Sequence, residues 1–231
     1  MLTAPSRALV ITPHPDDAEI SCGGTVANWI NSGTQVFYVL CTDGSKGTDD
    51  PDLEPGSLSA TRKLEQIEAA ETLGVKKVVM LDYPDGELED SREFRGRLVR
   101  EIRRFRPDIV LCPDPHRRTF YFHRDHRIAG IVAQDAVFPY ARDRLHFNEH
   151  ELEGLKPHKT GMILFWGTEE PDVFIDISEF MDRKLDSLGC HKSQLSGLDG
   201  AFERLRASGE QAGKHLGLKY AEAFRKVVFR T

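Results

Sequence analysis

The chain has few cysteines and no long apolar run. Its 231 residues include 4 cysteines, and none of them forms a Cys-x-x-Cys pair. A chain of this length can bury a full core without disulfide bonds, so we interpret the cysteines as free thiols in a reducing, cytoplasmic environment. No segment reaches the length of a membrane-spanning helix, and residues 1–7 lack the apolar region of a signal peptide. We therefore expect a cytoplasmic protein with no membrane partner.

An excess of positive charge is also missing. The chain has 31 Lys and Arg against 37 Asp and Glu, which gives a formal net charge of -6. Nucleic-acid binding needs a basic face, and the one basic cluster, in residues 100–106, fits the solvated side of a helix. We expect no nucleic-acid partner. No Gly-x-Gly-x-x-Gly follows the first apolar segment, which argues against a dinucleotide-binding oxidoreductase.

What the chain does contain is an alternation of short apolar segments with amphipathic ones. The apolar segments predict strands buried on both faces. These strands are Ala8–Thr12, Gln35–Thr42, Lys77–Asp82, Asp108–Cys112, Met162–Trp166 and Val173–Ile177. Helical spacing, closed by glycine or proline, predicts helices over Ala18–Asn31, Ser59–Leu73 and Ser91–Phe105. The alternation predicts an α/β fold, a Rossmann-like three-layer sandwich with a mostly parallel sheet.

No linker or internal repeat interrupts this pattern, so we expect a single domain across residues 1–231. The segment Asp43–Ser57 is rich in Gly, Asp and Pro and predicts a long loop over the carboxyl edge of the sheet, where substrate could bind. The segment Tyr220–Phe229 is compatible with a final strand or with a helix-to-strand tail.

Two clusters of histidine and aspartate lie beyond predicted strands. Pro13-His14-Pro15-Asp16-Asp17 directly follows the first strand, and His123-Arg124-Asp125-His126 lies beyond the fourth. Ligands of open α/β sheets bind at the carboxyl ends of the strands, so the clusters are expected to meet. Imidazole and carboxylate are zinc ligands, and a catalytic zinc uses three protein ligands and a water. The two clusters contain more histidines and aspartates than three ligands require, and the remaining side chains could transfer protons. This favours a hydrolase over a structural metal site. The alternatives are helix capping by the aspartates and solvated histidines at a polar helix start.

With further short motifs, the clusters resemble the LmbE-like zinc deacetylases. This family includes the N-acetylglucosaminyl-phosphatidylinositol de-N-acetylases and the deacetylases of mycothiol and bacillithiol synthesis. The further motifs are Gly23-Gly24-Thr25, Thr42-Asp43-Gly44-x-x-Gly47-Thr48, Arg62-x-x-Glu65, Leu73-Gly74, Pro84-Asp85-Gly86-x-Leu88 and His191-Lys192-Ser193-Gln194. The paired clusters in this order are specific, whereas the glycine motifs alone would not be.

The resemblance implies a metal site. By position, His14, Asp17 and His126 would be the ligands of one Zn²⁺ per chain, and Fe²⁺ could occupy the same ligands. Zinc lowers the pKa of its bound water from 15.7 to about 7, which makes hydroxide available at neutral pH. The implied reaction is hydrolysis of an acetamide to acetate and a free amine.

The resemblance also implies the catalytic groups. Asp16 would be the general base that takes a proton from the water. His123, as a cationic imidazole, would stabilise the oxyanion and serve the leaving amine, with Asp125 behind it. Independently of the resemblance, the position of Asp125 between the two histidines suggests that its carboxylate orients an imidazole by accepting the second ring proton.

Substrate contacts are implied at Arg62, Asp85 and His191. For Arg62 the alternative is a surface ion pair with Glu65. Asp85 could merely shape a turn, and His191 could be a surface histidine.

The chain departs from the family pattern at Ala18, where many members have glutamate. Glu19 follows, and no proposed ligand is altered, so the departure concerns the substrate rather than the metal. Nothing resembles the membrane anchor of the glycolipid-specific members, which favours an N-acetylglucosamine-type amino sugar or small conjugate as substrate. An amidase for another acylated small molecule, a non-catalytic metal- or sugar-binding module and a metal phosphoesterase are the alternatives. The resemblance also implies a homo-oligomer.

Overall fold

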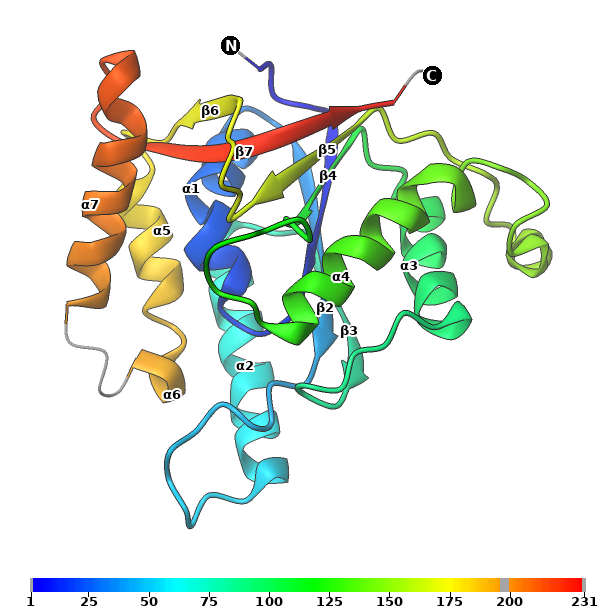
Figure 1. The fold of residues 1–231 in the computed structure, drawn as a ribbon, viewed down its shortest axis with the longest axis horizontal. Coiled ribbons are helices and arrows are strands. Elements are labelled where there is room, and N and C mark those ends of the chain that lie inside the picture. Colours follow the sequence, from blue (N-terminus) through cyan, green and yellow to red (C-terminus); the bar gives the residue numbers. More distant parts are fainter. Residues whose placement is uncertain (1, 196–199, 230–231) are drawn as a thin grey trace.

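The computed structural model describes residues 2–195 and 200–229 (Figure 1). The strands are β1 (Arg7–Thr12), β2 (Gln35–Thr42), β3 (Lys77–Tyr83), β4 (Ile109–Pro113), β5 (Met162–Trp166), β6 (Val173–Asp176) and β7 (Ala221–Val228). The helices are α1 (Asp17–Asn31), α2 (Pro55–Leu73), α3 (Arg92–Phe105), α4 (Arg124–Asp135), α5 (Met181–Leu188), α6 (Lys192–Leu195) and α7 (Ala201–Gly213). Short helical segments cover η1 (Ala136–Tyr140), η2 (Asn148–Glu153) and η3 (Lys214–Leu216).

The strands form one sheet in the order β3-β2-β1-β4-β5-β7-β6. The first five strands along the chain pair in parallel, and β7 runs antiparallel between β5 and β6. The predicted α/β class and mostly parallel sheet are confirmed. Of the two possibilities for the C-terminal segment, the final strand is correct.

Helices cover both faces of the sheet, and Figure 1 shows α3 and α4 on one side and α1 and α5 on the other. The central position of β1 in the sheet explains why its residues are continuously apolar. Leu9 and Ile11 pack into the core under α3 and α4, while Ala8 and Val10 pack into the core under α1. Because alternate side chains of a strand point to opposite faces, only a strand covered on both sides needs this pattern.

Most predicted boundaries agree with the structure to within one residue, and the largest difference is at α2. The helix α2 begins at Pro55 rather than Ser59, because proline is favoured in the first turn, where its missing N–H costs nothing. The expected loop from Asp43 therefore ends at Glu54. The four cysteines are free, as expected, and all of them are buried. Within the described residues, no helix combines the length and apolar character that crossing a bilayer requires.

The sheet order brings the two polar clusters together. Strand β1 pairs with β2 on one side and with β4 on the other, so the chain reverses its direction of winding at β1. The segments that leave the carboxyl ends of β1 and β4 diverge at this point and leave room for a ligand. The first segment carries His14, and the second leads to His123 and His126 at the start of α4.

Candidate functional site

The turn between β1 and α1 is closed by its own polar groups. The N–H of His14 donates to Asp17 Oδ2 at 3.0 Å, and Asp16 between them has a left-handed φ of 90°. A non-glycine residue in this region is strained and is found where the surrounding structure requires it. The Asp16 side chain makes no capping hydrogen bond to α1, so the capping alternative is wrong for this residue.

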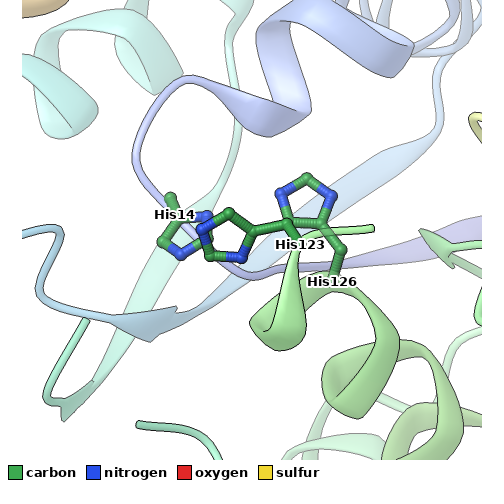
Figure 2. Close-up of side chains that lie close together, drawn as sticks. All are labelled: His14, His123 and His126. Carbon is green, nitrogen blue, oxygen red and sulfur yellow. The ribbon is translucent and has the colours of Figure 1, made fainter. Parts of the chain in front are cut away.

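Three predicted metal ligands converge at this turn. Asp17 Oδ2 lies 3.0 Å from His14 Nδ1 and 3.1 Å from His126 Nε2, and all three residues are buried. Figure 2 shows the imidazoles of His14 and His126 gathered with that of His123. Helix α4 can approach this closely because residue 130 is glycine, where a Cβ would lie 2.5 Å from the carbonyl oxygen of Pro113.

The donor set fits a divalent metal ion. Both ring nitrogens of His126 are buried, and neither makes a hydrogen bond among the described residues. Nε2 faces the carboxylate of Asp17, so a bound ion between the two groups would satisfy it. Donor atoms at the usual distances from a tetrahedral zinc ion lie about 3.3–3.5 Å apart, close to the spacings here. Two sets of residues have ligand atoms that all lie within 4.8 Å of one another, and both contain His14: one joins it to His123 and His126, the other to Asp85 and Asp125. Asp17 contacts two members of the first set.

The second nitrogen of His14 is held by carboxylates. His14 Nε2 lies 3.0 Å from Asp125 Oδ2 and 3.1 Å from Asp85 Oδ1. Burial by itself lowers the pKa of His14, but the hydrogen bonds to Asp125, Asp17 and Asp85 outweigh it and raise the pKa to about 12. The environment therefore strongly favours a positive charge here, from an imidazolium or from a metal ion.

The position of Asp125 corrects one prediction. Its carboxylate was expected behind His123 but contacts His14, because the backbone N–H groups of Gly86 and Leu88 hold it at 2.7 and 3.1 Å. These donors belong to the predicted Pro-Asp-Gly turn. Asp85, in the same turn, reaches His14 itself, so it does more than shape the backbone.

The Asp16 carboxylate is held beside the guanidinium of Arg62. Arg62 Nη2 lies 3.2 Å from Asp16 Oδ2 and also donates to the carbonyl oxygen of Pro15. Burial, with the nearby charge of Asp17, raises the pKa of Asp16 to about 7 against the opposing effect of Arg62. The carboxyl group can thus exchange a proton near neutral pH.

Arg62 is 3 % exposed, so its predicted alternative as a surface ion pair with Glu65 is wrong. Glu65 instead accepts hydrogen bonds from the N–H and hydroxyl of Ser193. The glycine motif after β2 makes room for the guanidinium. Gly44 has a φ of 64°, and a Cβ there would lie 2.9 Å from the guanidinium of Arg62. A Cβ at Gly47 would lie 2.8 Å from Arg62 Nη1.

His123 stands at the N-terminal cap of α4. The backbone N–H of Asp125 donates to His123 Nδ1 at 3.2 Å, which places the proton of a neutral ring on Nε2. Burial and the neighbouring His14 and His126 lower the pKa of His123. The structure thus favours a neutral imidazole over the cationic one that was expected.

His191 is fully buried, so the surface alternative is wrong. Its Nε2 lies 3.3 Å from Glu19 Oε2, and Glu19 Oε1 accepts from Gln66. Gln66 Oε1 in turn accepts from the N–H of Asp16 at 3.4 Å. His191 therefore reaches the site through a buried polar chain that the sequence did not indicate, and it is buried too deeply here to contact a substrate directly.

Tyr121 belongs to the site but was missed. Its ring centroid lies 5.2 Å from that of His126 in an edge-on contact and 6.2 Å from that of His123. A sequence signal exists, because Tyr121 lies in a run of aromatic residues directly before His123.

Comparison with known proteins places this geometry in a family. Residues 9–137, more than half of the chain, match the family model described as "PIG-L: GlcNAc-PI de-N-acetylase". The chain is 40% identical over 226 residues to a diacetylchitobiose deacetylase from Thermococcus kodakarensis, covering 96% of this chain and 83% of that protein. It is 29% identical over 201 residues to a probable N-acetyl-alpha-D-glucosaminyl L-malate deacetylase 2 from Bacillus cereus, with coverages of 83% and 85%.

A solved structure agrees with this match. The N,N'-diacetylchitobiose deacetylase from Pyrococcus horikoshii, complexed with its inhibitor, superposes with a TM-score of 0.91 at 36% identity. The superposition covers 97% of this chain and 84% of that one. The fold and the order of its elements are thus shared over nearly the whole chain.

Proposed function

Because the chain belongs to the family of GlcNAc-PI de-N-acetylases, we propose that it removes the N-acetyl group from a sugar of the N,N'-diacetylchitobiose type. The family and the enzyme class expected from the sequence, a hydrolytic N-deacetylase of amino sugars, are confirmed. The particular sugar is inferred from the names of the relatives at 40% and 36% identity. An amidase for a different acylated molecule is the alternative.

We propose that His14, Asp17 and His126 hold one Zn²⁺. The single observation that carries the proposal is that Asp17 Oδ2 lies 3.0 and 3.1 Å from one nitrogen of each histidine. The carboxylates at His14 Nε2 support it, since a histidine ligand usually donates its other ring proton to a carboxylate. When bound, such an ion supplies Lewis-acid activation of water and of the acetamide carbonyl.

The residues around the proposed metal site have separate roles in the reaction. Asp16, with a pKa near 7, takes a proton from the attacking water. His123 donates a hydrogen bond from Nε2 to the carbonyl oxygen as negative charge develops there. As the C–N bond breaks, the protonated Asp16 returns its proton to the amine nitrogen. Water and acetamide are thereby converted into acetate and a free amine, with no other reactant.

The test of the proposed function measures both the catalytic activity and the metal content of the protein. Purified protein is analysed for metal by elemental analysis and assayed for acetate release from N-acetylglucosamine and N,N'-diacetylchitobiose. We expect about one zinc per chain, and iron in its place would change the metal but not the mechanism. Release of acyl groups only from compounds without a sugar would favour the amidase, and metal without any hydrolysis would favour the binding module.

Asp16→Asn supplies the matched variant. We expect it to keep its metal and to lose about 10²–10⁴-fold in kcat, because the amide cannot accept the proton of water. Undiminished turnover in this variant would assign the base to another residue.

Two expectations about the whole protein remain predictions. We infer a single catalytic domain over residues 1–231 and a homo-oligomer. Light scattering during size-exclusion chromatography measures the second, and a monomeric mass would contradict it.

A further inference from the structure

Exposed aromatic surface is concentrated beside the site. Phe120, Tyr121 and Phe122 are 49%, 58% and 59% exposed, and they directly precede His123. They lie on the segment that joins β4 to α4, the green loop in Figure 1. Adjacent exposed aromatic side chains are unfavourable in water, and such patches mark binding surfaces.

Tyr121 connects this segment to the candidate site. The ring of Tyr121 contacts the ring of His126 edge-on, with centroids 5.2 Å apart. Phe120 and Phe122 flank Tyr121 in the chain and remain available to solvent.

The segment is anchored rather than loose. Glu169 accepts hydrogen bonds from the N–H groups of Arg118 and Thr119 at 2.9 and 2.6 Å, and from the Thr119 hydroxyl at 2.7 Å. Arg117 packs against Gly167, where a Cβ would overlap its guanidinium.

The guanidinium of Arg117 also supports the aromatic rings. Its central carbon lies 5.8 Å from the ring of Phe120 and 5.9 Å from that of Tyr121, within cation–π distance. Two aromatic side chains are therefore held before any substrate arrives, which reduces the entropy lost on binding.

We propose that Phe120, Tyr121 and Phe122 form a subsite for the sugar ring attached to the N-acetylglucosamine unit that is deacetylated. This inference rests on the proposed function. A pyranose is uncharged and exposes C–H groups on its faces, which pack well on flat, rigid aromatic side chains. The N-acetyl group must lie at the proposed catalytic residues for the reaction to occur. The neighbouring aromatic segment would then contact the part of the substrate beyond the deacetylated unit. The preferred substrate is then an N-acetylated disaccharide or longer chain rather than a monosaccharide.

The experiment compares two substrates of one enzyme. For wild type, kcat/KM for acetate release is higher with N,N'-diacetylchitobiose than with N-acetylglucosamine. In Phe120→Ala, Phe122→Ala and the double variant, we expect this preference to fall, by about tenfold in the double variant, which corresponds to about 1.4 kcal/mol. Phe122→Trp should restore more of the preference than Phe122→Leu, because stacking needs an aromatic ring.

Leu152→Ala is the matched control, because Leu152 is 91% exposed on η2 and carries no proposed role. It should leave both kcat/KM values unchanged. An unaltered preference in the double variant, with melting temperature and metal content retained, would overturn the subsite. A change of oligomeric mass without a change of preference would also overturn it and assign the patch to contact between copies. Absence of acetate release from every N-acetylated sugar would instead overturn the proposed function.

Discussion

At the scale of single residues, Asp125 organises the proposed metal site. Its carboxylate is fully buried and contacts His14 Nε2 together with the N–H groups of Gly86 and Leu88. Hydrogen bonding at Nε2 turns Nδ1 of the same ring toward Asp17. Asp125 thereby selects which nitrogen of His14 is available to a metal ion.

This role predicts the effect of Asp125→Asn. The amide keeps the shape but removes the charge that orients and polarises His14, so we expect metal affinity to fall by about 10–100-fold. Competition against a chromophoric chelator measures the affinity. Asp186→Asn, at an exposed position on α5, should leave it unchanged. Full metal affinity in Asp125→Asn would show that the orientation of His14 does not depend on this carboxylate.

The residues that gather at the proposed metal site could be predicted from sequence, whereas their hydrogen-bond partners could not. The local sequence shows His14 and Asp17 within one turn and His126 beyond another strand, and the family resemblance selects these three as ligands. The contact between His14 and Asp125 joins residues 111 positions apart, and it depends on where the Pro-Asp-Gly turn lies after folding. The burial of Arg62 likewise depends on glycines in a different loop.

At the scale of elements, a buried ion pair fastens α1, which begins at Asp17. Lys184 Nζ on α5 lies 2.5 Å from Glu222 Oε1 on β7 and donates to the carbonyl oxygen of Ile20 at 2.7 Å. Glu222 accepts from the N–H groups of Gly24 and Thr25 at 3.0 and 2.7 Å. The pair thus joins two helices to the sheet through the middle of α1.

We expect Lys184→Met and Glu222→Gln to be destabilising singly, by about 3–5 kcal/mol each, because each leaves an unpaired buried charge or weakens its compensation. The double variant should cost less than the sum of the two, since neither charge then remains. Urea unfolding of the four proteins gives these free energies. Additive losses would mean that the two side chains do not stabilise each other.

The elements themselves were largely predictable because β1, β2, β4 and β5 are buried on both faces and therefore continuously apolar. The apolar pattern of the sequence does not predict that Glu222 pairs with α1, because an acidic residue within a strand ordinarily indicates an exposed position. The backbone donors of Gly24 and Thr25 account for its burial.

At the scale of the whole molecule, the order of strands places the site. Five parallel strands wind in two directions from β1, and the antiparallel β7 separates β5 from the edge strand β6. The alternation of strands and helices predicts such a sheet but not the position of β7 between β5 and β6, which depends on long-range pairing. The end of β4 is tied to β7 by Asp114, whose carboxylate lies 3.0 and 3.1 Å from two nitrogens of Arg225.

This tie predicts a pH-dependent stability. Burial by itself raises the pKa of Asp114, but the hydrogen bonds from Arg225 and from the N–H of His116 outweigh it and lower the pKa. The folded pKa is then below the unfolded value of about 3.9. The contribution of Asp114 to stability is therefore fully present above that pH and is lost as the pH falls through the folded pKa.

We expect Asp114→Asn to be less stable than wild type at pH 7, by about 1–3 kcal/mol. Because the mutated side chain does not titrate, this difference should shrink below about pH 4. Urea unfolding between pH 3 and 7 measures it, with Asp182→Asn as the control, since the Asp182 side chain is 83% exposed. A difference that stays constant over that range would place the origin of the stabilisation in packing rather than in the charge of Asp114.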